Sequence, residues 1–289
     1  MAVYKIFPTK DASLYSMFAT MNAGIDPISQ ISNLNLALSS SPSVARNLIY
    51  FDTAEIKDVL NNKKEGTWEA YLKSNIATAQ GINEDSELYI YPLAQDWNNG
   101  TGTYLDQPIT TDGASWATPA FDGSNVPWSQ GNPTTPITSS RTDSYTDPHY
   151  AVAGGGVWFT TSSYGAMSYP YTQSFSMRSD KDLDIRVTNT VHDWYSGSIG
   201  NYGLIMKWEE AIEFNPNKQI QPVLQYYSID TNTIYPPSLE FRWDDYLYQT
   251  SSNIQVLSGS SLYINLDENP GIFYSESINR FRLNVREEY

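Results

Sequence analysis

Apolar and polar residues alternate along several short stretches of the chain. Leu88 and Ile90 alternate with tyrosines, and the apolar residues of 239–243 alternate with charged ones. The same period of two occurs at 183–187 and at 281–285. Successive side chains of a strand point to opposite faces, so each stretch predicts a half-buried β-strand. Clusters of Gly, Pro, Asn and Asp separate the stretches, which is typical of an all-β sandwich.

Helical patterns are few. Residues 52–55 read Asp-Thr-Ala-Glu, which resembles a capping box, and the apolar positions of 56–60 continue it. This pattern predicts a short helix that ends at Asn61. The stretch 71–79 fits either a helix or a strand. We therefore expect one or two short helices beside the strands.

A long polar region, rich in Gly, Ser, Thr and Pro, covers residues 98–182. Structureless loops of this length are uncommon inside a compact domain, so we expect extended loops, short strands and contacts with partners here. A surface insertion without a role is an equal alternative. The run Gly154-Gly155-Gly156 is typical of a flexible loop or of a close approach between backbones, because no lysine follows to complete a phosphate-binding loop.

Two short segments of the chain have similar sequences. Asp96-Trp97 is followed by Gly100, and Asp193-Trp194 is followed by Gly197. Each segment follows an alternating stretch. We therefore expect two equivalent strand ends, each with its Trp in the core and a turn at its Gly.

The charge balance of the 289-residue chain narrows the choice of partners. It has 17 Lys and Arg against 32 Asp and Glu, a net charge of −15 and a pI near 4.4. Phosphate backbones carry the same sign of charge, so a nucleic acid is not expected as a partner. No apolar run approaches the roughly 18 residues of a membrane span, so no membrane contact is expected either.

Few residues of the chain suit catalysis. The absence of cysteine excludes disulfides and thiolate metal sites, and two histidines are too few for a multi-histidine metal centre. His192 is adjacent to Asp193, but neighbours on the strand predicted at 187–191 face opposite sides and do not pair readily. His149 lies in a predicted loop. We therefore expect no catalytic residue and no cofactor-binding residue.

Calcium is the metal for which the sequence offers ligands. Oxygen donors gather in one turn-rich segment, namely Asp96, Asn98, Asn99, Asp106 and Asp112. Ca²⁺ prefers such donors. Asp and Asn are also the usual residues of turns, and the turn interpretation is the favoured one.

Aromatic residues make up 14% of the chain, with 22 Tyr and 8 Trp. Their side chains bury a large area and keep a polar group, which suits contact with another subunit or the stacking of a sugar ring. Trp97 is expected in the core, whereas Trp116 and Trp128 are flanked by Gly and Pro and are expected at the surface. The candidates for contact with a partner or a glycan are Trp116, Trp128, Trp158, Tyr164, Tyr169 and Tyr171.

Several blocks of residues occur in the order of a known domain family. They are Lys10–Tyr15, Asn22–Gly24, Arg46–Asp52, Leu88–Leu93, Trp97, Gly100–Thr103, Asp112–Trp116, Asp193–Trp194, Asn201–Leu204 and Pro237–Phe241. Over roughly residues 4–245 the chain resembles the DNRLRE domain family, with a long insertion after Trp116 and no secretion signal before the domain. The resemblance implies a jelly-roll-like antiparallel β-sandwich with long loop insertions. Such domains occur in surface-displayed proteins and are described as carbohydrate-binding-like.

A narrower resemblance rests on three other segments. Ile6–Asp11, Ile234–Leu239 and Ile278–Glu287 are similar to structural proteins of large tailed bacteriophages, including marine ones. In that group further β-rich sequence follows the sandwich. We therefore expect a sandwich over 1–245 and further strands over 246–289, at the start of a following β-rich region.

Together these resemblances imply a non-enzymatic virion structural protein. It would be a head decoration, neck or tail component that assembles in the host cytoplasm and stays in the virion. Its partners would be other virion proteins and symmetric copies of itself. The alternative is a carbohydrate-binding module, either of a surface adhesin or of a phage receptor-binding part. A polysaccharide lyase or hydrolase is a third, weaker interpretation.

Overall fold

The computed structural model describes most of the chain in two compact units, Met1–Tyr246 and Leu247–Tyr289. The described residues are 2–34, 43–63, 66–82, 85–120, 127–128, 137–139, 154–162, 164, 168–209, 212–213, 222–244, 262–268 and 282–287. The sequence predicts the boundary at 245, one residue before this division.

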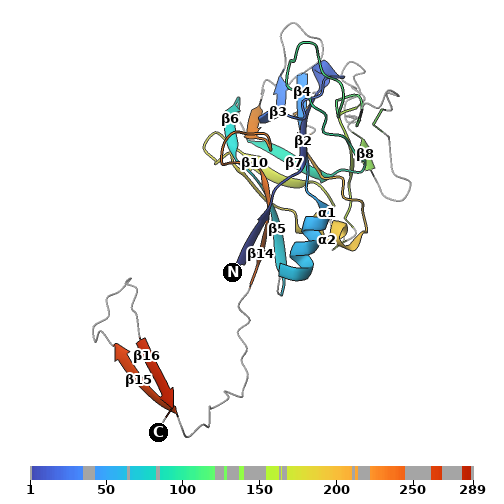
Figure 1. Cartoon of the computed structure of the whole chain (residues 1–289). Helices are drawn as coiled ribbons and strands as arrows, with labels where there is room; N and C mark the ends of the chain where they lie inside the picture. The colour runs from blue at the N-terminus through green and yellow to red at the C-terminus, as the bar shows by residue number, and fades with distance from the viewer. Residues whose placement is uncertain are drawn as a thin grey trace. The chain divides into compact units, whose positions relative to one another are not determined.

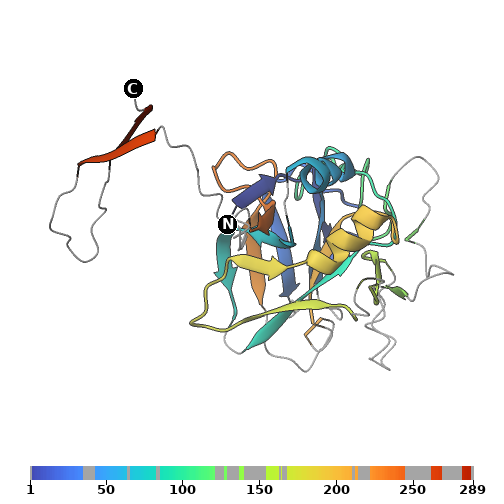
Figure 2. The same ribbon diagram turned by 90° about the horizontal axis from the view of Figure 1, so that it is seen from below.

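The first unit is a β-sandwich of two sheets (Figures 1 and 2). The smaller sheet has the order β1-β14-β5-β11, and all its pairings are antiparallel. Its strands are β1 (Ala2–Ile6), β14 (Ser238–Trp243), β5 (Trp68–Ser74) and β11 (Leu183–Arg186).

The larger sheet has the order β10-β7-β12-β4-β3-β13-β6, and β2 pairs with β4 outside this path. Its pairings are antiparallel as well. Its strands are β2 (Lys10–Tyr15), β3 (Ile28–Leu34), β4 (Ser43–Tyr50), β6 (Ile76–Gln80), β7 (Ser86–Pro92), β10 (Tyr171–Phe175), β12 (Leu204–Trp208) and β13 (Val223–Tyr227). The all-β antiparallel sandwich predicted from the alternation is confirmed.

The core lies between the two sheets and explains why the alternating stretches became strands. In β5 the buried residues Trp68, Ala70 and Leu72 alternate with residues that stay partly exposed. Each large apolar side chain buried in this way contributes roughly 1.5–3 kcal/mol, so the two-residue period fixes which face of β5 turns inward. The stretch 71–79, which fitted helix or strand, forms parts of β5 and β6.

The first predicted helix is confirmed. It is α1 (Thr53–Asp58), and the Asp52 carboxylate caps it by accepting a hydrogen bond from the Ala54 N–H. A π-helical turn, Val59–Lys63, continues it, and a 3₁₀ turn lies at Ser16–Phe18. None of the helices within the described residues is long and apolar enough to span a membrane.

The second helix, α2 (Thr188–Ser196), corrects the strand predicted at 187–191. The alternating pattern suggested a strand, but Val187, Val191 and Trp194 are all buried at helical spacing. Gly197 ends the helix in the left-handed conformation, with φ 76°. Both Trp of the repeated Asp-Trp segment are in the core as expected, but only Trp97 follows a strand.

The described parts of the 98–182 region contain both loops and short strands. β8 (Ile137–Ser139) pairs with β9 (Val157–Phe159), and β10 joins the larger sheet. The loops before them gather around Asn22, whose amide nitrogen donates to the Asn99 and Ala114 carbonyls. Its side-chain oxygen accepts from the Gly102 N–H at 2.8 Å. A single buried amide therefore ties the start of the region to the loop between β2 and β3.

The glycine run is a place where backbones approach closely, one of its two predicted interpretations. The Gly155 N–H donates to the Trp116 carbonyl, and the Arg46 guanidinium donates to the Gly155 carbonyl at 2.9 Å. A Cβ at Gly155 would lie 2.8 Å from the Trp116 ring. All three glycines have positive φ.

The second unit contains an antiparallel hairpin of β15 (Leu262–Glu268) and β16 (Arg282–Glu287). Further strands were expected after 245, and these two lie there. Ile264 is opposite Val285, and Leu266 is opposite Leu283.

Candidate functional site

An open hollow of about 810 Å³ lies at one end of the smaller sheet. Its walls come from the start of β5, the ends of β11 and β14, and the first turns of α2, together with Tyr164. Aromatic, charged and amide side chains are mixed in its lining. A concave surface with a few convergent polar groups is the usual form of a ligand site.

Three aromatic rings are stacked along one wall of the hollow. The His192 ring lies between the rings of Trp68 and Tyr164, at centroid distances of 4.2 and 3.9 Å. The interplanar angles are 29° and 10°. Tyr164 is 47% exposed, whereas Trp68 is almost buried, so Tyr164 presents the accessible ring of the stack. We call these three residues the aromatic stack.

Hydrogen bonds between β5 and α2 hold the aromatic stack in place. The Ala70 N–H donates to the Thr188 hydroxyl at 3.0 Å, and the Val187 N–H donates to the Ala70 carbonyl at 2.8 Å. α2 therefore begins against β5, two residues after Trp68 along that strand. His192, one helical turn further along α2, comes to lie over the Trp68 ring.

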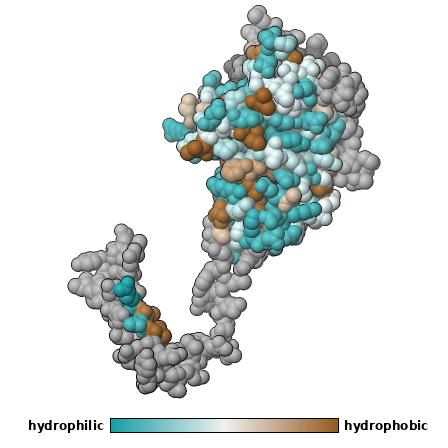
Figure 3. Space-filling model, in the orientation of Figure 1, coloured by the Kyte–Doolittle hydropathy of each residue, from teal (hydrophilic) through white to brown (hydrophobic). Residues whose placement is uncertain are grey.

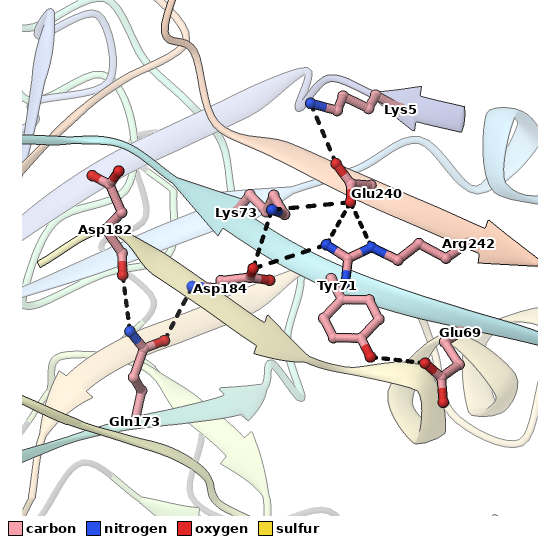
Figure 4. A network of polar contacts seen from close by, with 9 residues as sticks. All are labelled: Lys5, Glu69, Tyr71, Lys73, Gln173, Asp182, Asp184, Glu240 and Arg242. Atoms are coloured by element: carbon pink, nitrogen blue, oxygen red, sulfur yellow. Dashed lines mark hydrogen bonds and ion pairs between the residues drawn. The ribbon is translucent and has the colours of Figure 1, made fainter. Parts of the chain in front are cut away.

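Charged side chains of alternate sign line the floor of the hollow, on the outer face of the smaller sheet. The Arg242 guanidinium lies 3.9 Å from the centroid of the Tyr71 ring, and the Tyr71 hydroxyl donates to Glu69 at 2.7 Å (Figure 4). Arg186 forms an ion pair with Glu69 at 3.1 Å. The strand alternation puts these residues on the face opposite to the core.

A second group of charges keeps Arg242 in position. Glu240 accepts from Arg242 at 2.6 Å and pairs with Lys5 at 3.3 Å, while Asp184 pairs with Lys73 at 3.1 Å (Figure 4). Burial alone would raise the pKa of Glu240, but the hydrogen bonds from Arg242 and Lys5 outweigh it and hold that pKa below its ordinary value. The carboxylate is therefore ionised at neutral pH, and the guanidinium is fixed above Tyr71.

This arrangement can bind a ligand with both apolar faces and hydroxyl groups. The aromatic stack offers a flat apolar surface, and the Arg–carboxylate pairs beside it offer donors and acceptors in fixed positions. The lining contains two arginines, Glu69 and Asp244, so cationic and anionic groups are balanced.

Three of the predicted contact residues are buried, which corrects the expectation that Trp116 and Trp128 lie at the surface. Trp116 and Trp158 are at most 1% exposed and lie over the buried Arg46 guanidinium, at 4.8 and 5.4 Å. Trp128 donates its indole N–H to the Ser115 carbonyl at 3.0 Å and is also buried.

Two predicted tyrosines are buried as well, beneath α2. The Tyr169 and Tyr171 hydroxyls lie 3.2 and 3.1 Å from the Thr190 hydroxyl. Burial raises the pKa of both phenols. Of the six candidates only Tyr164 is exposed, and it lies in the hollow.

The carboxylates of two calcium candidates, Asp106 and Asp112, accept hydrogen bonds from nearby loop residues. Asp106 accepts from the N–H and hydroxyl of Thr103, and Asp112 accepts from those of Thr101. The Asn99 amide donates to a backbone carbonyl, Asp96 pairs with a lysine, and the Asn98 backbone bonds to neighbouring loops. Among the residues that the structure describes, no three His, Asp or Glu gather closely enough to hold a metal ion.

The structure places His192 and its neighbour Asp193 in different surroundings. Asp193 is buried and accepts from Ser162 and Tyr169, in a helix rather than at a strand end. His192 lines the hollow, although the sequence analysis predicted no catalytic role for it. His149 lies outside the described residues.

Sequence reasoning missed Trp68, Arg186 and Arg242 as members of the hollow. A usable signal was present, because the alternation that turns Leu239 and Phe241 inward turns Arg242 outward. Nothing in the sequence, however, showed that β14 lies between β1 and β5, or that α2 starts beside β5.

Comparisons with known proteins give no family for this chain. No family model matches it, and no curated protein is similar to it at a meaningful level. The resemblances described from sequence blocks therefore stay predictions.

Proposed function

We propose that the chain is a non-enzymatic protein whose sandwich binds carbohydrate in the hollow. The observation that carries this proposal is the aromatic stack beside paired Arg and Glu side chains. A sugar ring has an apolar face that matches an aromatic ring, and hydroxyls around its edge that need both donors and acceptors. Tyr164 and the Arg186–Glu69 pair supply these two kinds of contact next to each other.

Burial of the other candidates removes the aromatic loops as a contact surface. The indoles expected to contact other subunits, Trp116, Trp128 and Trp158, already pack inside the sandwich. They are therefore not available as surface anchors for either function. The exposed candidate that is left, Tyr164, lines the hollow.

Replacement of Tyr164 tests the proposal. A glycan array identifies bound sugars, and titration calorimetry then compares the Tyr164→Ala variant with the wild-type chain. We expect a loss of at least about tenfold in affinity, on the order of 1.4 kcal/mol. Tyr235→Ala is the matched control, because Tyr235 is 49% exposed but lies outside the hollow, and it should leave affinity unchanged.

Two results would reject the proposal. One is an array on which no glycan retains the chain. The other is a glycan whose affinity is the same for the wild type and for Tyr164→Ala.

A role as a virion structural protein is the second candidate, and the hairpin of the second unit favours it. Ile264, Leu283 and Val285 are 60, 64 and 54% exposed. An isolated two-stranded hairpin is marginally stable, and exposed aliphatic side chains at this density mark contact surfaces. Neighbouring virion subunits, including copies of this chain, would cover them. A phage receptor-binding part would combine both candidates.

Immunogold electron microscopy of purified phage particles tests this second candidate. An antiserum against the chain should label every particle at one station of the head, neck or tail. Label at fibre tips alone supports a receptor-binding part. Particles that stay unlabelled, while the surface of the source cell is labelled, would exclude a virion role.

A further inference from the structure

Two smaller hollows lie beside the first one along β11. They have volumes of about 260 and 460 Å³. Arg186 lines all three hollows, and Tyr71 lines the first and the last. The last one ends at Gln173 of β10 and Asp184 of β11. The three hollows therefore lie side by side, and we call the surface that they cover, from the aromatic stack to Gln173, the groove.

A peptide strand would be the obvious occupant of a groove along an edge strand, but β11 is protected against it. Such a peptide needs free backbone groups on the edge. The Gln173 amide nitrogen donates to the Asp182 carbonyl at 2.8 Å, and its oxygen accepts from the Asp184 N–H at 3.1 Å (Figure 4). The Gln173 side chain thus already occupies the edge groups at this end of the groove.

The charges of the groove favour an uncharged occupant. Arg186 and Arg242 are balanced by Glu69, Asp184 and Asp244, and the whole chain carries a net charge of −15. A polyanionic chain would be repelled by this field at long range. The guanidinium and carboxylate groups of these residues can donate hydrogen bonds to sugar hydroxyls and accept hydrogen bonds from them.

We propose that the groove binds the interior of an uncharged oligosaccharide chain. One unit packs on Tyr164, and the following units pass Arg186 and reach Gln173. This inference rests on the proposed carbohydrate-binding function and extends it from a single ring to a chain. Affinity therefore increases with the number of sugar units, because the far hollow is reached only by longer chains.

Oligosaccharide ladders of two to six units test the inference on the full chain. Cello-, manno- and malto-oligosaccharides serve as probes in titration calorimetry, together with any sugar that the array identifies. We expect the six-unit member of the bound series to bind about tenfold or more tightly than the two-unit member. Gln173→Ala should remove this gain and leave two-unit binding unchanged. Gln225→Ala, a glutamine of β13 outside the groove, should keep the gain.

The outcomes separate the two proposals. Equal affinity for two and six units overturns the groove and leaves the carbohydrate site intact. A gain that persists in Gln173→Ala also overturns the groove. Preference for a sulfated chain would overturn the inference that the ligand is uncharged. An absence of any saccharide binding would overturn both the proposed function and the inference.

Discussion

Three buried charged residues form ion pairs inside the sandwich. Arg46, which is fully buried, donates to both carboxylate oxygens of Glu213 at 3.0 and 2.7 Å. Lys207, also buried, lies 3.1 Å from the same carboxylate. Removing one partner from a buried pair leaves an uncompensated charge, so these side chains tolerate little change. The two indoles over Arg46 exclude water from it, which is why Trp116 and Trp158 cannot serve as surface platforms.

Asp11 is a buried acid whose ionisation opposes folding. It is 2% exposed, and burial raises its pKa to about 7 although the Ile229 N–H and the Ser29 hydroxyl donate to it. Between about pH 4 and 7 the folded chain binds a proton that the unfolded chain has lost. The free energy of unfolding therefore falls as the pH rises through this window, by at most about 4 kcal/mol.

Asp11→Asn should remove this pH dependence. A single carboxylate oxygen accepts both hydrogen bonds, and the amide oxygen of Asn can replace it. Chemical unfolding at pH 4 and pH 8 measures the stability gain of the variant, which should be larger at pH 8. Asp106→Asn is a control of opposite sign, because the hydrogen bonds from Thr103 lower the pKa of Asp106. The loss of stability caused by Asp106→Asn should be smallest at low pH. A pH-independent gain for Asp11→Asn would contradict this account.

At the scale of elements, α2 is decisive, because it carries His192 and covers Tyr169 and Tyr171. Its residues have low helix propensity, and it forms because it buries Val191 and Trp194 and ends in a left-handed glycine. Figures 1 and 2 show α1 and α2 side by side at one end of the sandwich. Tertiary packing therefore decided a segment for which local preference pointed to a strand.

Two glycines with the same φ separate backbone strain from crowding. Gly155 and Gly197 both have φ 76°, but a Cβ at Gly155 would meet the Trp116 ring and Arg46 within 3 Å, whereas nothing lies within 4 Å at Gly197. Gly197→Ala should cost about 1–2 kcal/mol of unfolding free energy, the cost of the left-handed conformation. Gly155→Ala should cost at least about 3 kcal/mol, because overpacking is added.

Thermal or denaturant unfolding of both variants measures the difference. Equal losses would show that the loop holding Gly155 moves away from Trp116 without cost.

At the scale of the whole molecule, sheet order creates the candidate site. β1, β14, β5 and β11 are far apart in sequence, yet their outward residues form one network of charges on the outer face of the smaller sheet (Figure 4). The face of the sandwich that Figure 3 shows is mostly polar over its described residues, with separate apolar spots. On that face, recognition through one large apolar surface is not supported.

The sequence by itself determined the fold class and the four strands that alternation marks, β7, β11, β14 and β16. Side chains alternate between the two faces of any strand, and an apolar side chain such as that of Phe241 favours the buried face whichever strands lie beside it. Asp52 likewise predicted the start of α1, because a cap acts within one turn. These features depend on neighbours in the chain.

Only the tertiary structure decided which residues meet. Trp116 was expected at the surface because its flanking residues form turns, but Arg46, 70 positions away, draws it into the core. The aromatic stack joins residues 68, 164 and 192, and no local pattern connects them. Contacts between distant segments depend on sheet order and on the path of long loops, and a single chain's periodicity carries no information about either.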